Sequence, residues 1–138
     1  MMNEQNAIEL TLSCAAEDCE DFNQRFYQKF YQLEPHAQSL MSHIDEGVQG
    51  KMMAEIFRLF LAPAVAETES EYLLFEMKNH THAYFVPPEM YRGLNQALFE
   101  TLKSAASRVW SDEIERAVQN RLNAMLTAIA SALAVGAP

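Results

Sequence analysis

The adjacent prolines Pro87–Pro88 separate two helical patterns, and no other feature of the sequence constrains the fold as much. Before them, apolar side chains recur at helical spacing from Tyr72 to Met77, with His80 close behind. After them, a second amphipathic pattern runs from Tyr91 to Leu98 in steps of three and four residues. Because proline ends a helix, the sequence predicts two helices that meet at a corner. His80 on the last turn of the first helix, beside an aromatic residue of the next, is well placed to act as a ligand.

Helical periodicity extends along the whole chain, and turn residues are scarce, with four glycines and five prolines among 138 residues. We therefore predict one all-α domain of six or seven helices, and the family resemblance described below implies six to eight. Besides the two helices around Pro87–Pro88, the second of which runs from Glu89 to about Val109, helices are predicted over Asn6–Asp21, over Phe22–Leu33, from Val48 or Gln49 to near Pro63, and from the N-cap Ser111 to Leu133. Pro35 predicts a break and a short turn that ends at Met41, and Ser42–Gly50 predicts a polar corner.

The segment Phe22–Leu33 carries an aromatic stripe. Phe22, Phe26 and Phe30 follow at steps of four, which places them on one helix face and predicts that they belong to the core. Tyr27 differs in kind, because a buried phenol hydroxyl needs a hydrogen-bond partner. We therefore expect its hydroxyl to supply a hydrogen bond inside a cavity.

The chain is acidic, with a formal net charge of -9. This charge argues against nucleic acids and anionic membrane surfaces as partners. No apolar run approaches the roughly 20 residues of a membrane span, and the amino terminus lacks the pattern of a secretory signal, so we predict a cytoplasmic protein. Cys14 and Cys19 lie five residues apart on a predicted helix and would point in different directions, which predicts reduced thiols.

In chain order, these features resemble the globin family, and most of all the bacterial single-domain globins and the haem domain of flavohaemoglobins. The resemblance covers Phe26 to about Leu126. Its motifs are Phe26-Tyr27 with Tyr31 and Pro35, which resemble the family's FY…F…P run; Gln49-Gly50, which resembles the start of the distal helix; His80, Val86, Pro88 and Tyr91, which resemble the proximal pattern; and Trp110–Glu113, which resembles the start of the final helix.

The resemblance implies a globin fold around a pocket for haem b (iron protoporphyrin IX). His80 would be the axial ligand of the iron, with Val86 and Tyr91 on the same side. On the distal side, Tyr27 and Gln49 would donate hydrogen bonds to a bound diatomic gas, each worth about 1–3 kcal/mol. The apolar neighbours of the haem would be Met41, Met53 and Phe57.

Two positions have competitors. His82 is the other candidate ligand, but it lies about 200° around the helix from His80. An alignment shifted by two residues replaces Gln49 by Lys51, but then Glu55 would face the haem, where burial of a carboxylate is costly.

The pattern also departs from the family. Met41 stands where globins usually have a phenylalanine. Tyr91 matches the proximal tyrosine of flavohaemoglobins, whereas only Ala132 or Leu133 lies where their glutamate would pair with it.

The function implied by the resemblance is reversible binding and transport of a diatomic gas, oxygen above all, with NO and CO as further ligands. We do not expect an enzyme as the main function. One alternative is NO dioxygenase or peroxidase-like activity, which would need an external reductase because no flavin or nicotinamide domain is expected on the chain. The other alternative is a haem-poor or haem-free globin fold that acts as a sensory or interaction module. A homodimer is compatible with each of these functions.

Overall fold

The structure is a computed structural model that describes residues 2–41, 46–61 and 90–135. In these ranges the chain forms helices and no strand, so the all-α prediction is confirmed for this part of the molecule. The helices are α1 (Glu4–Asp18), α2 (Phe22–Leu33), α3 (Pro35–Leu40), α4 (Glu46–Leu61), α7 (Tyr91–Ala105) and α8 (Asp112–Val135). None of them combines the length and the apolar character that crossing a bilayer requires.

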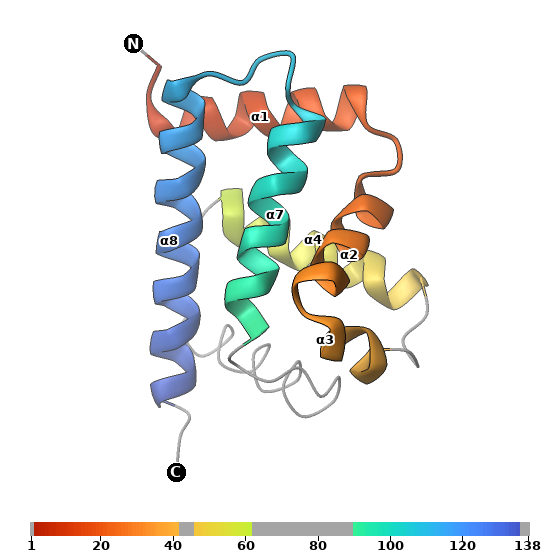
Figure 1. The fold of residues 1–138 in the computed structure, drawn as a ribbon. Coiled ribbons are helices and arrows are strands. Elements are labelled where there is room, and N and C mark those ends of the chain that lie inside the picture. The colour runs from red at the N-terminus through yellow and green to blue at the C-terminus, as the bar shows by residue number, and fades with distance from the viewer. Residues whose placement is uncertain (1, 42–45, 62–89, 136–138) are drawn as a thin grey trace.

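Figure 1 shows two helices, α1 and α4, running across the direction of α7 and α8. α7 and α8 lie side by side and run in opposite directions, and α1 crosses them at one end (Figure 1). α2 packs against α7 and continues through a sharp bend into α3, while α4 contacts both α1 and α8. The core therefore lies where α1, α2, α4, α7 and α8 converge.

Where a capping residue stands directly before a helix in the sequence, the predicted start of that helix is close to the observed one. α2 has the predicted bounds, Phe22–Leu33. α1 starts two residues early, at Glu4, because the Asn6 main-chain N–H donates a 2.7 Å hydrogen bond to Asn3 Oδ1. It ends at Asp18, three residues before the predicted end at Asp21. At α8 the Ile114 N–H donates to Ser111 Oγ at 3.2 Å, which confirms the predicted N-cap.

Two predicted irregular segments are helical instead. The residues after Pro35 form α3 rather than a turn, because a proline at the first helical position needs no N–H partner and already has the helical φ. Most of the predicted corner Ser42–Gly50 falls at the start of α4, which begins at Glu46. An acidic side chain in a first turn is favourable there, because it faces the positive end of the helix dipole. Residues 42–45 lie outside the described residues.

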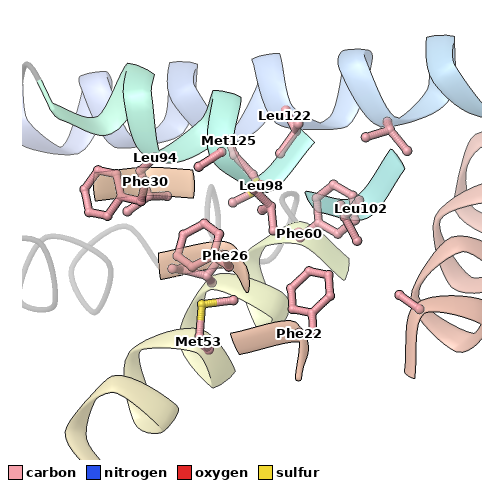
Figure 2. Packing of buried hydrophobic residues seen from close by; sticks show 14 of the residues in the cluster. Phe22, Phe26, Phe30, Met53, Phe60, Leu94, Leu98, Leu102, Leu122 and Met125 are labelled. Atoms are coloured by element: carbon pink, nitrogen blue, oxygen red, sulfur yellow. The ribbon is translucent and has the colours of Figure 1, made fainter. Parts of the chain in front are cut away.

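The aromatic stripe of α2 is buried, as predicted. Phe22, Phe26 and Phe30 are 8%, 0% and 1% exposed, and the last two rings stack 6.1 Å apart. Figure 2 shows these rings facing side chains from three other helices. The labelled partners are Met53 and Phe60 of α4, Leu94, Leu98 and Leu102 of α7, and Leu122 and Met125 of α8.

The charged side chain of Arg121, on α8, is buried, with 5% of its surface exposed. Its Nη1 atom donates to the main-chain carbonyls of Phe60 at 2.7 Å and Leu61 at 3.0 Å. Its Nη2 atom donates to Gln5 Oε1 at 2.9 Å, and the Glu4 carboxylate lies 3.6 Å away. The last carbonyls of a helix have no partner within the helix. Arg121 therefore caps the end of α4 and ties it to α1.

Candidate functional site

The candidate site starts from a contact between α2 and α4. The Tyr27 hydroxyl donates a 3.1 Å hydrogen bond to the main-chain carbonyl of Gln49, 22 residues further along the chain. Tyr27 is 6% exposed, and this burial raises its pKa, so the phenol stays protonated at neutral pH. A neutral phenol hydroxyl can donate one hydrogen bond, and here the Gln49 carbonyl accepts it.

The predicted distal residues of α4 share one helix face. Gln49, Met53 and Phe57 follow at steps of four, so each lies one turn beyond the last. Met53 is 1% exposed, and Phe57 is partly buried with its ring 5.5 Å from that of Phe22. Lys51, the competitor of Gln49, is exposed. The face that meets Tyr27 is thus apolar beyond Gln49.

The remaining predicted residues divide into two groups. Met41, at the end of α3, is 2% exposed, and Tyr91, at the start of α7, is 4% exposed; both belong to the main hydrophobic cluster. His80 and Val86 lie outside the described residues, as does His82. The described part of the site is therefore its predicted distal side, together with Met41 and Tyr91.

Hollows lined by described residues adjoin this core. A groove of about 730 Å³ runs over α7 between the end of α2 and α8, and its lining includes Glu34, Arg92, Gln96 and Asn123. A smaller pocket of about 350 Å³ lies where α1, α2 and α4 meet, and its lining includes Phe22 and Phe57. Of these two hollows, the smaller has one predicted site residue, Phe57, in its lining, and the larger has none.

Among the described residues, sequence reasoning missed four buried polar side chains, which are Thr11, Asn95, Thr101 and Arg121. Asn95 Nδ2 donates to the Leu122 carbonyl at 2.9 Å, while its Oδ1 atom is buried with no hydrogen-bond partner in the described structure. The available signal is position: Asn95 stands one turn from the apolar residues Tyr91 and Leu98, and Arg121 stands one turn from Ala117 and Met125. A polar residue on an apolar stripe indicates a buried hydrogen bond.

The cysteines are free thiols, and both are buried. Burial, followed by hydrogen bonds to Asp18 and Asp21 respectively, raises the pKa of Cys14 and of Cys19. Because the thiolate is the reactive form, we expect both cysteines to react with a disulfide reagent at pH 7 at least about tenfold more slowly in the folded protein than in urea. Absorbance of the released thiolate measures this rate. Fast labelling of either thiol in the folded protein would contradict the burial.

Neither a protein-family model nor a curated protein matches the sequence. In the ranges that the structure describes, no three His, Cys, Asp or Glu side chains gather where they could hold a metal ion. A functional assignment therefore depends on the residues themselves.

Proposed function

We propose that this chain is a globin that holds haem b and binds a diatomic gas reversibly, oxygen above all. The observation that carries the proposal is the buried Tyr27 hydroxyl, held by the main chain of Gln49 on the apolar face of α4. Buried sulfur and aromatic side chains with a single hydroxyl donor are chemically suited to one face of a haem. The crossed packing of α1, α2, α4, α7 and α8 also supports a globin fold, in which helices pack at large angles around the haem.

In this proposal, the residues around His80 would contact one face of the haem and the residues around Tyr27 the other. His80 would supply an imidazole ligand to the iron, and Val86, Tyr91 and Met41 would supply apolar and aromatic contacts to the haem. When bound, the haem supplies the iron on which reversible gas binding depends. To donate to a bound gas, the Tyr27 O–H would have to turn away from the Gln49 carbonyl that accepts its hydrogen bond in this structure. Met53 and Phe57 would keep water away, which strengthens that hydrogen bond.

A spectroscopic titration tests the proposal. The purified full chain, mixed with hemin and reduced under CO, should give a sharp Soret band that shifts on CO binding. His80→Ala should lose the band or broaden it, while the matched control His82→Ala should keep it. A featureless spectrum of the unmutated protein, or identical spectra for both variants, would remove the proposal.

Tyr27→Phe removes one hydroxyl and keeps the ring. In the haem-loaded protein we expect oxygen to dissociate about tenfold faster, because a buried hydrogen bond of about 1.4 kcal/mol is lost. Stopped-flow displacement of oxygen by CO measures the rate. Tyr31→Phe is the control, since this partly buried tyrosine lies on the same helix with its ring 6.0 Å from that of Tyr27. Equal rates for the two variants would exclude Tyr27 as the donor.

One observation favours a second candidate, a haem-free interaction module. The Tyr27 hydroxyl already has a partner within the protein, so the described side of the site is satisfied without a ligand. In that case hemin should not raise the melting temperature, because only a ligand that binds the folded state stabilises it. A rise of several degrees with hemin in the unmutated chain, absent from His80→Ala, would exclude this candidate.

A further inference from the structure

The larger groove, of about 730 Å³, follows α7 on the side where the end of α2 and α8 flank it. From α7, its lining takes Arg92, Asn95, Gln96 and Phe99, at spacings that place them on one helix face. At 1.5 Å per residue, Arg92 and Phe99 lie about 10.5 Å apart along the helix. An extended peptide advances about 3.3 Å per residue. The groove is therefore long enough for about three residues of extended peptide.

The wall that α8 supplies combines apolar surface with amide groups. Gln119, Leu122, Asn123 and Leu126 line the groove from this helix, again at spacings of three and four residues. Gln119 and Asn123 are exposed, and so is Gln96 on α7. An amide side chain carries both N–H donors and a carbonyl acceptor, which are the groups that a peptide main chain presents. The lining therefore matches a ligand that carries peptide groups as well as an apolar side chain.

Asn95 is the buried polar residue of this lining and has an unused acceptor. Its Nδ2 atom donates to the Leu122 carbonyl at 2.9 Å, which fixes the orientation of the amide. Its Oδ1 atom is buried with no hydrogen-bond partner in the described structure, an arrangement that costs free energy. Because Oδ1 has almost no exposed surface, a donor would reach it only when the lining moves, and the neighbouring Gln96 is a long, exposed side chain. An N–H group of a bound molecule would then satisfy this acceptor.

The charges of the lining balance each other. Glu34 and Arg92 are its charged residues, one of each sign, although the chain as a whole has a net charge of -9. A Cβ atom at position 93 would overlap the Glu34 side chain, so Gly93 allows this side chain to lie against α7 next to Arg92. A lining without net charge favours a ligand without net charge.

We propose that this groove binds a short, uncharged peptide of about three residues in an extended conformation. One peptide N–H would donate to Asn95 Oδ1, and the exposed amides of Gln96 and Asn123 would pair with neighbouring peptide groups. An apolar side chain of the peptide would pack on Phe99 and Leu126. Hydrogen bonds to the peptide main chain give affinity, while the apolar contact selects the side chain. This binding would not require haem and is independent of the proposed gas chemistry.

The probe is a blocked tripeptide, acetyl-alanyl-leucyl-alanine amide, added to the isotope-labelled full-length protein. We expect saturable NMR shifts with a Kd below about 1 mM. The side-chain amide resonance of Asn95 should shift, because its Oδ1 atom gains a donor. That of Asn120, which is exposed on α8 and does not line the groove, should stay in place. The absence of saturable shifts, or shifts that leave Asn95 unchanged, would overturn the proposal.

A matched pair of substitutions locates the binding. Asn123→Trp should obstruct the groove and weaken peptide binding at least about tenfold. Asn120→Trp makes the same change at an exposed position of the same helix outside the lining, and should leave the Kd within about twofold. Equal affinities of the two variants would overturn the proposal.

Two further measurements separate a peptide from other occupants. Isoamyl alcohol has the apolar group of the leucyl side chain but no peptide group, so it should bind at least about tenfold more weakly than the tripeptide. Equal binding would mean that the groove accepts apolar groups without contacting a main chain, which contradicts the proposal. Shifts of the same resonances on concentrating the protein without peptide would mean that a second copy covers the groove, and would overturn it too.

Discussion

Arg121→Met should lower the free energy of unfolding by about 3 kcal/mol. Methionine keeps much of the length and the packing of the arginine stem, so the loss comes mainly from hydrogen bonds. The carbonyl of Phe60 is buried and that of Leu61 partly buried, and both accept from Arg121. Leaving such acceptors unpaired costs about 1–3 kcal/mol each, which outweighs the gain from no longer burying a charge. The ion pair with the exposed Glu4 adds little to the free energy of unfolding, because solvent screens an exposed charge.

Chemical denaturation with urea, followed by circular dichroism, measures this change, and the melting temperature should fall by about 10 °C. Arg116→Met is the matched control, because Arg116 is an exposed arginine on the same helix and its replacement should change stability by less than about 0.5 kcal/mol. Equal midpoints for the two variants would mean that Arg121 does not cap α4 in solution.

Arg121 also illustrates what a sequence can and cannot predict. The apolar stripe of α8, with Ile114, Val118 and Leu122, follows from spacing alone, and so does the buried stripe of α2. A charged residue beside such a stripe indicates a buried partner but does not identify it. The partners here are main-chain carbonyls of α4, about 60 residues earlier in the chain. Main-chain carbonyls occur at every residue, so no sequence pattern marks which of them accept.

A different ambiguity explains the misread segment after Pro35. A proline both interrupts a preceding helix and suits the first position of a new one. The sequence signal for a break and the signal for α3 are therefore identical, and packing against α2 decides between them.

The candidate site was predictable in part. Spacing and the globin resemblance led to Tyr27 and Gln49 as a polar pair, and the structure brings these residues into contact. The contact, however, uses the main-chain carbonyl of Gln49. The resemblance had implied instead that the side chains of both residues donate to a gas. Hydroxyl orientation depends on the nearest acceptor in three dimensions, which residue type does not specify. The predictions for His80 and Val86 concern residues outside the described ranges and stay predictions.

Leu98→Ala should be comparably destabilising, for a reason unrelated to hydrogen bonding. Leu98 is 0% exposed at the centre of the face that α7 turns toward α2 and α8, where Figure 2 shows it among Phe26, Phe60 and Met125. Truncation removes the transfer free energy of the lost methyl groups and leaves a cavity, together about 2–5 kcal/mol. Because side chains from α2, α4 and α8 meet at this position, no single helix can shift to fill the space without disturbing another contact, so we expect about 4 kcal/mol, toward the upper end of that range.

The matched control for this substitution is Leu10→Ala on α1, where the leucine is 38% exposed and the same atoms are removed from a partly solvated position. Leu10→Ala should lower the free energy of unfolding by less than about 1 kcal/mol, because part of the leucine side chain stays in contact with water in the folded protein. Urea denaturation of both variants gives the comparison, and the slope of the transition should stay constant if only the native core has changed. Equal losses for Leu98→Ala and Leu10→Ala would mean that α7 does not pack against α2 and α8 as described. The proposed haem site would then lose its scaffold as well, because α2 holds Tyr27 and α7 begins with Tyr91.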